Sequence, residues 1–462
     1  MFERLLPDRP VTSFDEYVAR RSGGQGLAAA HRLGPEATIE LINESGLRGR
    51  GGGGFPTGRK WAGIAAQKQF KRYVVCNGAE GEPGTFKDRT ILRTDPYQVV
   101  EGVAIAAMAV GADEAYICLK ASFEREIEAV TRAVEELQSA GVCGACTVGI
   151  VAGPDEYLFG EEKAMLEVIE GKPPLPRLFP PYEQGLFASS PNEGWEAGSG
   201  VGPDLDRPNP TLVNNVETLA NVTHILAHGA DWLRSHGTAE SPGTAVATVV
   251  GDVVHDGVAE VELGTPLREV IRLVGGGPRP GRTVQAVFPG VANAVVTGDQ
   301  IDVPVSYEGF ASIGSGMGSL GYIVYDDTAC MIAAAYRCSR FLAVESCGQC
   351  PPCKLGSDAI TGALERFETG GATGEDLDTI TGWLGKVTDG SRCFLATEEQ
   401  QMVASVLRSF PAEFDTHMAH GGCPHDDSRP FPKIVDISDG VATYDERFWL
   451  KQPDWTYADP AE

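Results

Sequence analysis

The sequence predicts an α/β domain, followed by a small β-grasp-like domain and a C-terminal helical bundle. In the first half, short β-rich runs alternate with helical patterns, which is typical of a largely parallel sheet covered by helices. In the middle of the chain, two β-rich runs flank a single helical segment. In the last third, helical patterns follow one another with short connections, as they do in a bundle.

The α/β prediction depends on the order of segments within residues 1–240. Residues 71–77 form a β-rich run that ends in a Gly- and Pro-rich loop, and a helical pattern follows over residues 99–110. The other expected elements are a strand at 115–119, a helix at 123–137, a strand at 147–152 and a helix at 216–228. Residues 173–210 are rich in Pro, Gly and Ser, and we expect them to form a long surface loop.

A change in composition divides the rest of the chain. The expected β-grasp-like domain covers residues 241–326, with β-rich runs at 245–250 and 284–288 and a helix at 266–274. The expected four-helix domain covers residues 327–430, with helices at 328–344, 355–367, 374–386 and 397–410. Residues 431–462 are rich in Asp and aromatic residues and are expected to form an extended tail.

Charge and hydrophobicity argue against two classes of function. The 462 residues carry a formal net charge of −26, which would repel a phosphate backbone, so nucleic acid is not an expected partner. No apolar run approaches the roughly 20 residues of a membrane span. Residues 1–20 also lack the apolar core of a signal peptide. We therefore expect a soluble, cytoplasmic protein without direct membrane insertion. Its 11 cysteines then argue against a disulfide framework, because clustered cysteines in a reducing compartment more often bind metal or carry redox chemistry.

The strongest motif is ESCGQCPPCK at residues 345–354, which places Cys347, Cys350 and Cys353 three residues apart. Three thiolates at this spacing can reach different irons of one iron–sulfur cluster, because the loop wraps around it. A four-iron cluster needs a fourth ligand, and Cys393 and Cys423 are the downstream candidates. A zinc site is less consistent with the sequence, because no second CxxC or CxxH pair follows.

The other cysteines carry weaker signals. Cys143 and Cys146 form an isolated CxxC, which fits a chance pair or buried thiols better than a redox motif. Four further cysteines lie in apolar segments and are interpreted as core residues: Cys76, Cys118, Cys330 and Cys338.

A glycine-rich loop, GLRGRGGGGFPTGRK, occupies residues 46–60. Glycines at 49, 51 and 54 match GxGxxG, but a Rossmann fingerprint should follow a strand, and residues 39–43 look helical. The loop still suits a flat ring and a phosphate, because glycine lets the backbone approach closely and exposed amides and cations meet the anion. A second glycine cluster at residues 314–318 is interpreted as a tight interdomain turn.

Acidic and amide residues follow the first expected strand. The stretch NGAEGEPG at residues 77–84 begins at the carboxyl end of that strand, where open α/β sheets bind ligands. GEE at residues 160–162 begins another expected helix, where acids also stabilise the helix dipole without any functional role.

These stretches together resemble the NADH-binding flavoprotein subunit of respiratory complex I. They equally resemble its relatives in NAD-linked formate dehydrogenases and NAD-reducing hydrogenases. The matching stretches occur in family order: GLRGRGGGGFPTGRKW (46–61), NGAEGEPGTFKDR (77–89), GEE (160–162), PTLVNNVETLANV (210–222), LGTPLREVI (263–271) and ESCGQCPPCK (345–354). The resemblance implies an FMN-binding α/β domain, a β-grasp domain and a helical bundle that holds a [4Fe–4S] cluster.

The resemblance also implies roles for individual residues. The expected FMN-binding residues are Gly49, Arg50, Gly51, Gly52, Lys60, Asn77, Glu80, Asn214 and Asn215. Phe55, Glu82 and Glu162 are expected to face the dinucleotide. Cys347, Cys350, Cys353 and Cys393 are expected to ligate the cluster, which leaves Cys423 unassigned.

The function implied by the resemblance is electron entry. NADH would deliver a hydride to FMN, which converts a two-electron step into one-electron steps, and electrons would leave through the cluster. The implied partners are a thioredoxin-like [2Fe–2S] subunit and a larger iron–sulfur, molybdenum or hydrogenase subunit. Through such partners the protein would lie at the inner face of the membrane.

Four positions depart from the family pattern. Ala79 stands where the family usually has Asp, and Gly63 replaces an aromatic residue. Phe179 replaces a Lys, and Tyr182 a Phe, in the segment that covers the nicotinamide nucleotide in the family. The flavin and cluster motifs are thus nearly intact, while the NADH pocket is partly altered. The alternative function is therefore an electron-relay paralogue that keeps flavin and cluster with a degenerate NADH pocket.

Overall fold

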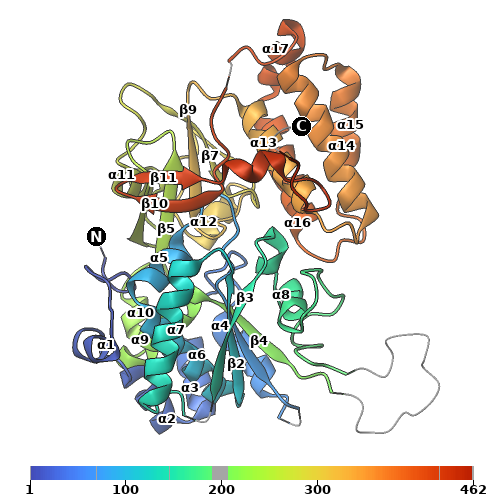
Figure 1. The fold of residues 1–462 in the computed structure, drawn as a ribbon. Coiled ribbons are helices and arrows are strands. Elements are labelled where there is room, and N and C mark those ends of the chain that lie inside the picture. Colours follow the sequence, from blue (N-terminus) through green and yellow to red (C-terminus); the bar gives the residue numbers. More distant parts are fainter. Residues whose placement is uncertain (1, 69, 145, 190–206, 426, 460–462) are drawn as a thin grey trace, which may run out of the picture.

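The computed structural model describes residues 2–68, 70–144, 146–189, 207–425 and 427–459. Figure 1 shows an α/β layer, a second sheet beside it and a group of helices at the C-terminal end. Residues 190–206, the middle of the expected loop at 173–210, lie outside the described residues. Within the described ranges, no helix has the length and hydrophobicity that a bilayer crossing needs.

The first sheet has four parallel strands in the order β3-β2-β1-β4. Its strands are β1 (Tyr73–Asn77), β2 (Glu114–Lys120), β3 (Thr147–Gly153) and β4 (Thr211–Asn215). The first three match the β-rich runs of the sequence, whereas β4 was not predicted. Because β2 and β4 lie on opposite sides of β1, the strand order reverses at β1, and open sheets bind ligands at such a point.

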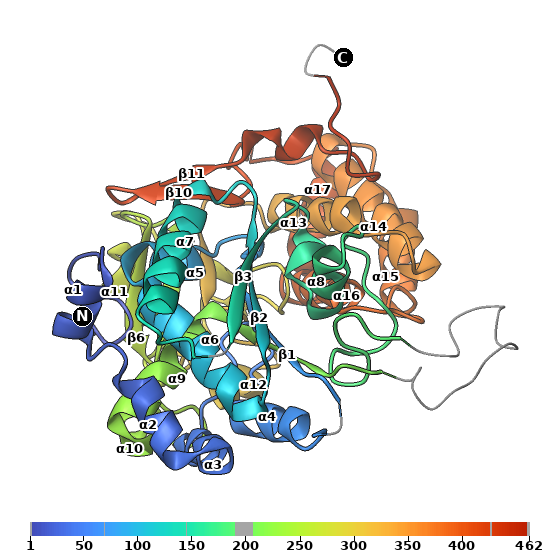
Figure 2. The ribbon, with the colours of Figure 1, turned by 60° about the horizontal axis from the view of Figure 1, so that its bottom comes forward.

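Helices cover both faces of this sheet (Figure 2). Alternate residues of β1 point to opposite sides, so Val74 and Cys76 pack with α6 and α7, while Tyr73 and Val75 pack with α8. The helices of this part are α1 (Phe14–Arg21), α2 (Gln25–Leu33), α3 (Pro35–Ser45), α4 (Thr57–Ala65), α5 (Lys87–Thr94), α6 (Pro96–Val110), α7 (Glu124–Ser139), the 3₁₀ turn η1 (Tyr157–Gly160), α8 (Glu162–Ile169), α9 (Val216–His228) and α10 (Ala230–Arg234). The expected helices at 99–110, 123–137 and 216–228 are all present.

The second sheet has five strands in the order β6-β5-β9-β7-β8. Only β5 and β9 run parallel, and the other neighbours are antiparallel. Its elements are β5 (Thr244–Gly251), β6 (Gly257–Glu262), α11 (Leu267–Gly275), β7 (Val284–Pro289), β8 (Val296–Thr297), α12 (Tyr307–Ser312) and β9 (Gly321–Asp326). The single helix α11 packs on β5 through Val270, Ile271 and Val274, as the pattern of the sequence predicts.

Helices α13 to α17 form the third part of the chain. They are α13 (Met331–Glu345), α14 (Pro351–Thr369), α15 (Gly374–Leu384), α16 (Leu395–Ser409) and α17 (Pro411–His420). The first four correspond to the four expected helices. The fifth was missed because α17 begins directly after α16, with Pro411 in its first turn, where a proline initiates rather than continues a helix.

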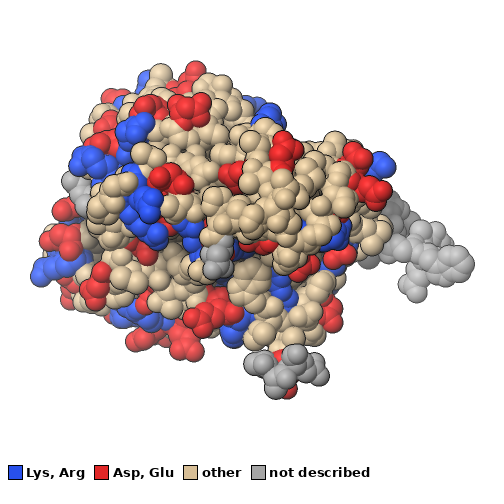
Figure 3. Space-filling model, turned by 90° about the horizontal axis from the view of Figure 1, so that it is seen from above, with Lys and Arg blue, Asp and Glu red and all other residues tan. Residues whose placement is uncertain are grey.

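The expectation of an extended C-terminal tail was wrong. Residues after 430 form a hairpin of β10 (Ile434–Ser438) and β11 (Val441–Tyr444), followed by the 3₁₀ turn η2 (Glu446–Leu450). Phe431 and Phe448 stack 4.3 Å apart and are buried among the bundle side chains. Apolar burial therefore holds this segment on the domain. On the face in Figure 3, Lys and Arg side chains are interspersed with Asp and Glu.

Candidate functional site

A cavity of about 440 Å³ lies where the three parts of the chain meet. Its volume is in the range of small-molecule sites. The glycine loop, the ends of β1 and β4, the turn before α8 and the start of α16 all contribute to its wall. The lining residues are Gly51, Gly52, Gly53, Asn77, Ala79, Glu80, Gly81, Glu82, Thr85, Asp88, Tyr157, Leu158, Gly160, Glu161, Asn215, Ala292, Asn293, Gly318, Ser319, Cys393, Phe394, Leu395 and Glu398.

The cavity lies at the point where the order of the parallel strands reverses. Asn77 ends β1 and Asn215 ends β4, and the two residues are register partners on neighbouring parallel strands. Asn77 donates to the carbonyl of Gly160 at 2.7 Å, and Asn215 donates to Asp88 at 2.7 Å. Both amides are therefore fixed in orientation at the carboxyl edge of the sheet.

The glycine loop forms another part of the wall. Its backbone turns tightly, because Gly49 N–H donates to the Phe55 carbonyl at 2.9 Å and the Tyr307 hydroxyl donates to the Gly49 carbonyl at 2.8 Å. A Cβ on Gly51 would lie 3.2 Å from the Cβ of Asn215. The lack of side chains at residues 51–53 leaves a flat backbone surface against which a ring can lie.

The structure brings six of the expected flavin- and dinucleotide-binding residues to the cavity wall. They are Gly51, Gly52, Asn77, Glu80, Glu82 and Asn215. The Glu80 carboxylate is partly committed to the protein, because it accepts hydrogen bonds from the backbone of Asp88 and from Arg89 at 3.0 Å each. It fixes the start of α5 beside the cavity.

The other six expected residues are not among the lining residues. Gly49 lies in the turn of the loop. The buried Arg50 guanidinium donates to the carbonyls of Pro242 and Thr244, at 3.0 and 3.2 Å, and so ties the loop to β5. Asn214 accepts a hydrogen bond from the Trp61 indole at 2.8 Å.

Lys60 and Glu162 were expected to bind two different ligand groups but contact each other in this structure. Their ion pair spans 2.5 Å. Phe55 is 54% exposed. These residues lie around the loop rather than on the cavity wall, and their roles toward a ligand stay predictions.

Sequence reasoning missed several acidic and phenolic residues in the wall. Tyr157 donates to Glu82 at 2.6 Å, and the oxygens of Glu398 lie 3.1 and 3.2 Å from the same hydroxyl. Burial raises the pKa of both Glu82 and Glu398. Nothing in the local sequence around Tyr157 or Glu398 indicates a site.

Two further carboxyl groups of the wall have a pKa above the usual range for their type. Burial raises the pKa of Glu161 to about 7 and that of Asp88 to about 6. Both lie within stretches that carried the family resemblance, GEE and NGAEGEPGTFKDR, so the motif could have identified them. Gly318, expected only as part of an interdomain turn, also lines the cavity.

A second, smaller cavity adjoins the first. Cys347, Cys350, Cys353 and Cys393 all line it, and Cys423 does not. Leu158, Cys393 and Leu395 line both cavities, so a single layer of side chains separates them. Cys350 caps α14 and Cys353 lies in its first turn, where the helix dipole favours a thiolate. Burial raises the pKa of the free Cys393 thiol to about 12, which a bound metal would reverse.

A nucleotide-sized cavity beside four converging cysteines defines a class of protein: a flavoprotein that also carries an iron–sulfur centre. Comparisons with known proteins agree. Residues 42–224 match the Nuo51 FMN-binding domain. Residues 333–417 match the NADH-ubiquinone oxidoreductase-F iron–sulfur binding region.

Whole-chain relatives identify the family. The NADH-quinone oxidoreductase F 2 subunit of Rhizobium meliloti is 37% identical over 92% of this chain and 100% of that protein. The NADP-reducing hydrogenase subunit HndC of Solidesulfovibrio fructosivorans is 35% identical over 89% of this chain and 82% of that protein. A crystal structure of NAD⁺-reducing [NiFe]-hydrogenase in the H₂-reduced state superposes with a TM-score of 0.74 at 30% identity, over 90% of this chain and 68% of that one. The chain belongs to the family of NADH-quinone oxidoreductase F subunits, and it has the FMN-binding and [4Fe–4S]-binding domains of that family.

Proposed function

We propose that this chain is the electron-entry subunit of a larger assembly, oxidising NADH at FMN and passing electrons singly to a [4Fe–4S] cluster. The observation that supports this most directly is the shared wall of the two cavities. Cys393 belongs to both linings, so a cluster ligand lies directly beside the ligand cavity. Electrons could then pass from the flavin directly to the cluster, with no other domain between the two.

The residues of the large cavity suit FMN. The glycine backbone at 51–53 would lie against the ring, and Asn77 and Asn215 would present amides at the sheet edge. When bound, FMN takes a hydride as two electrons and returns them one at a time. The protein's part is to align the dinucleotide on this ring and to exclude water. Hydride transfer of this kind requires no acid–base triad.

The four cysteines suit a [4Fe–4S] cluster. We propose Cys347, Cys350, Cys353 and Cys393 as its ligands, because they surround one small cavity. Two polar groups already contact this set: the Ser346 hydroxyl lies 3.4 Å from the Cys353 sulfur, and the Gln349 amide donates to the Cys347 sulfur at 3.6 Å. Such contacts would tune the potential of a bound cluster.

The domain boundaries and partners form part of the same proposal. We assign residues 1–240 to an FMN- and NADH-binding domain, 241–326 to a β-grasp-like domain and 327–430 to the cluster domain. A thioredoxin-like [2Fe–2S] subunit and a larger iron–sulfur, molybdenum or hydrogenase subunit would receive the electrons in the cytoplasm. The named relatives include both quinone oxidoreductase and hydrogenase subunits, which supports this range of assemblies.

A relay paralogue is the competing function, favoured by the altered positions Ala79 and Phe179. Ala79 lies in the cavity wall, and Phe179 is 43% exposed. Protein purified without oxygen and loaded with FMN should reduce ferricyanide with NADH if it is the electron-entry subunit. Flavin and iron in full amount without any NADH-dependent reduction would instead establish the relay.

A further inference from the structure

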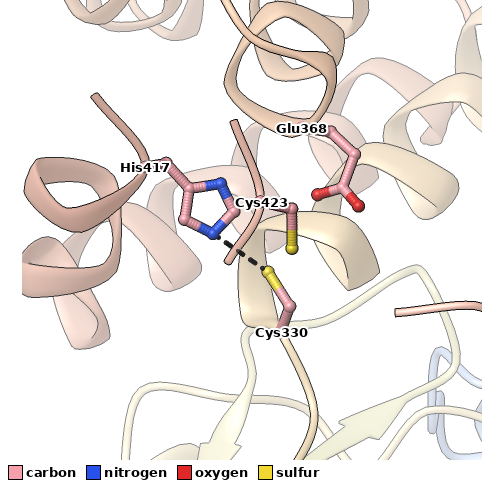
Figure 4. Close-up of side chains that lie close together, drawn as sticks. All are labelled: Cys330, Glu368, His417 and Cys423. Carbon is pink, nitrogen blue, oxygen red and sulfur yellow. Dashed lines mark hydrogen bonds between the residues drawn. The ribbon is translucent and has the colours of Figure 1, made fainter. Parts of the chain in front are cut away.

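Four side chains with metal-binding groups converge in the helical part of the chain, away from both cavities. Cys330, Glu368, His417 and Cys423 each offer one ligand atom, and these atoms all lie within 4.8 Å of one another. Figure 4 shows them pointing into the same space from four separate segments. Cys330 and His417 are buried, and the other two are half-buried. In the sequence Cys330 was interpreted as a core residue and Cys423 was left without a role.

The imidazole of His417 is oriented as a metal ligand would be. Its Nδ1 lies 3.0 Å from the Phe367 carbonyl, which requires that nitrogen to carry the proton and donate. Nε2 is then left unprotonated, and it lies 3.3 Å from the Cys330 sulfur. A carbonyl that holds one ring nitrogen while the other faces the ion is the usual outer contact of a metal-binding histidine.

Cys330 is placed where a thiolate is stabilised. It caps the N-terminus of α13, and its sulfur accepts a hydrogen bond from the backbone of Ala333 at 3.3 Å. Amides at a helix N-terminus favour the ionised thiol, which is the form that binds metal. Without an ion the buried thiol is costly to ionise, and burial raises its pKa.

Glu368 supplies a second, independent observation. Among the described residues, its Oε2 atom is buried and has no hydrogen-bond partner. Buried carboxylate oxygens without partners are rare in folded proteins, and a bound cation is one of their few explanations. The backbone fixes the approach of the fourth ligand, because Cys423 N–H donates to the Glu368 carbonyl at 2.9 Å.

We propose that Cys330, Glu368, His417 and Cys423 bind one Zn²⁺ ion in a closed structural site. Two sulfurs, one imidazole and one carboxylate form a tetrahedral set of the kind that zinc takes. Thiolates disfavour Mg²⁺ and Ca²⁺, and two cysteines are too few for a second four-iron cluster. Bonds of about 2.0–2.3 Å place neighbouring ligand atoms about 3.3–3.8 Å apart. The Cys330–His417 pair already has this separation, and the remaining atoms need to move inward by about 1 Å.

The site would fix the C-terminal segment to the helices. Cys423 lies at the start of the chain that leads to the β10–β11 hairpin, and Asp427, four residues later, accepts from the Cys330 backbone N–H at 2.9 Å. Asp427 also pairs with Arg337 and Arg429. An ion here would connect four parts of the chain: the start of α13, the end of α14, the end of α17 and the start of the C-terminal segment.

The test is metal analysis of the full chain with its iron–sulfur cluster intact. We expect about one zinc ion per chain in addition to the cluster iron, retained on dialysis against a weak chelator. Zinc-edge X-ray absorption should show two sulfur and two nitrogen or oxygen ligands. Absence of zinc would overturn the proposal, and so would a four-sulfur shell, because that ion would occupy the cysteine cavity instead.

Variants provide the second arm. Cys423→Ser and His417→Gln should lose the zinc while iron, flavin and NADH–ferricyanide activity stay as in the wild type. Cys338→Ala, which removes another buried thiol of α13 outside the site, is the matched control and should keep it. If a variant does not fold, replacement of zinc by Co²⁺ in the wild type decides the question. A thiolate-to-cobalt charge-transfer band supports the site, and an octahedral cobalt spectrum without that band overturns it.

Discussion

The Tyr157 hydroxyl donates a hydrogen bond to the Glu82 carboxylate across 2.6 Å in the wall of the large cavity. Glu398 lies on the other side of the same hydroxyl, at 3.1 and 3.2 Å. A phenol has one proton, so it cannot donate to both carboxylates. One of the two carboxyl groups must therefore hold a proton for both contacts to be full hydrogen bonds, which agrees with burial raising the pKa of Glu82 and of Glu398. The three groups form a hydrogen-bonded chain that one neutral carboxyl group completes.

Removing the phenolic oxygen should destabilise the protein. Tyr157→Phe leaves both buried carboxyl groups without that partner, which costs about 1–3 kcal/mol. We expect a lower thermal midpoint by calorimetry. Tyr336→Phe is the control, because its hydroxyl bonds Glu365 at the surface across 3.1 Å and its loss should have little effect. Equal midpoints for the two variants would contradict the bridging role of Tyr157.

Substitution of single cysteines should separate the two groups of thiols. Cys393→Ala removes one of the four cysteines around the small cavity, and we expect it to abolish the signal of the reduced cubane in electron spin resonance. Cys423→Ala should leave that signal intact, because Cys423 lies with Cys330 and His417 instead. The reverse pattern would show that the cluster uses Cys423.

Residue patterns predicted three of the four parallel strands and the long helices, because these segments carry either a short apolar run, as in β1, or a periodic apolar face that the fold buries, as in α7. The five residues of β4 were missed, since Thr211-Leu-Val-Asn-Asn follows a Pro-rich stretch and is too short to show a period. The C-terminal hairpin had a readable signal. Asp439 and Gly440 connect β10 to β11 with φ values of 51° and 78°. Two positive φ values form a type I′ turn, for which Asp-Gly is a strong indication.

The site was only partly predictable for a different reason. Motif residues such as Asn77 and Cys347 can be recognised by their spacing, but Tyr157, Glu398 and His417 reach their sites through tertiary packing. His417 and Cys330 are 87 residues apart in the sequence yet in contact. Arg50 shows the converse, since a motif cation serves to anchor the loop rather than to line the cavity.

The glycine loop offers a test of where the flavin lies. A Cβ on Gly53 would meet no protein atom within 4 Å, although this residue lines the cavity. Gly53→Val should therefore leave the stability of the flavin-free protein within about 0.5 kcal/mol but lower its FMN affinity, measured by fluorescence titration. Gly63→Val is the control, because Gly63 also has open space around it but lies on α4 outside the cavity. Unchanged FMN binding in Gly53→Val would place the ring elsewhere.

The buried carboxyl of Glu399 should give the stability a pH dependence. Burial raises its pKa from 4.5 to about 8, although a hydrogen bond from Ser339 acts in the opposite direction and lowers it. The folded chain thus holds a proton that the unfolded chain loses above about 4.5, so stability falls as pH rises from there to about 8.

Glu399→Gln removes this titration. The free energy of unfolding of this variant relative to the wild type should increase between about pH 5 and 8, by on the order of a few kcal/mol at the upper end. The thermal midpoints of the two proteins, measured across this pH range, should follow the same trend. Glu128→Gln, at an exposed position of α7, should show no such trend. A constant difference across the pH range would mean that Glu399 is ionised in the folded protein.

We expect this protein to prefer NADH strongly over NADPH. The cavity wall includes the carboxylates of Glu80 and Glu82, and none of its described lining residues is Lys or Arg. A carboxylate accepts a hydrogen bond from a free ribose hydroxyl but repels a 2′-phosphate. Phe179 stands where the family usually has Lys, so no cation at that position offsets the repulsion. Like charges held together cost several kcal/mol, which corresponds to about a hundredfold or more in kcat/KM.

Steady-state kinetics with both dinucleotides test this preference, with ferricyanide as the acceptor. Glu82→Gln should narrow the ratio of the two kcat/KM values, because Glu82 is one of the wall carboxyls that the dinucleotide would meet. Glu128→Gln lies outside the cavity and should leave the ratio unchanged. One of the relatives is named as a subunit of an NADP-reducing hydrogenase, so a preference for NADPH would also be an informative result. Equal or better turnover with NADPH would mean that the ribose binds away from these carboxylates, beside a cation such as Lys60 freed from Glu162.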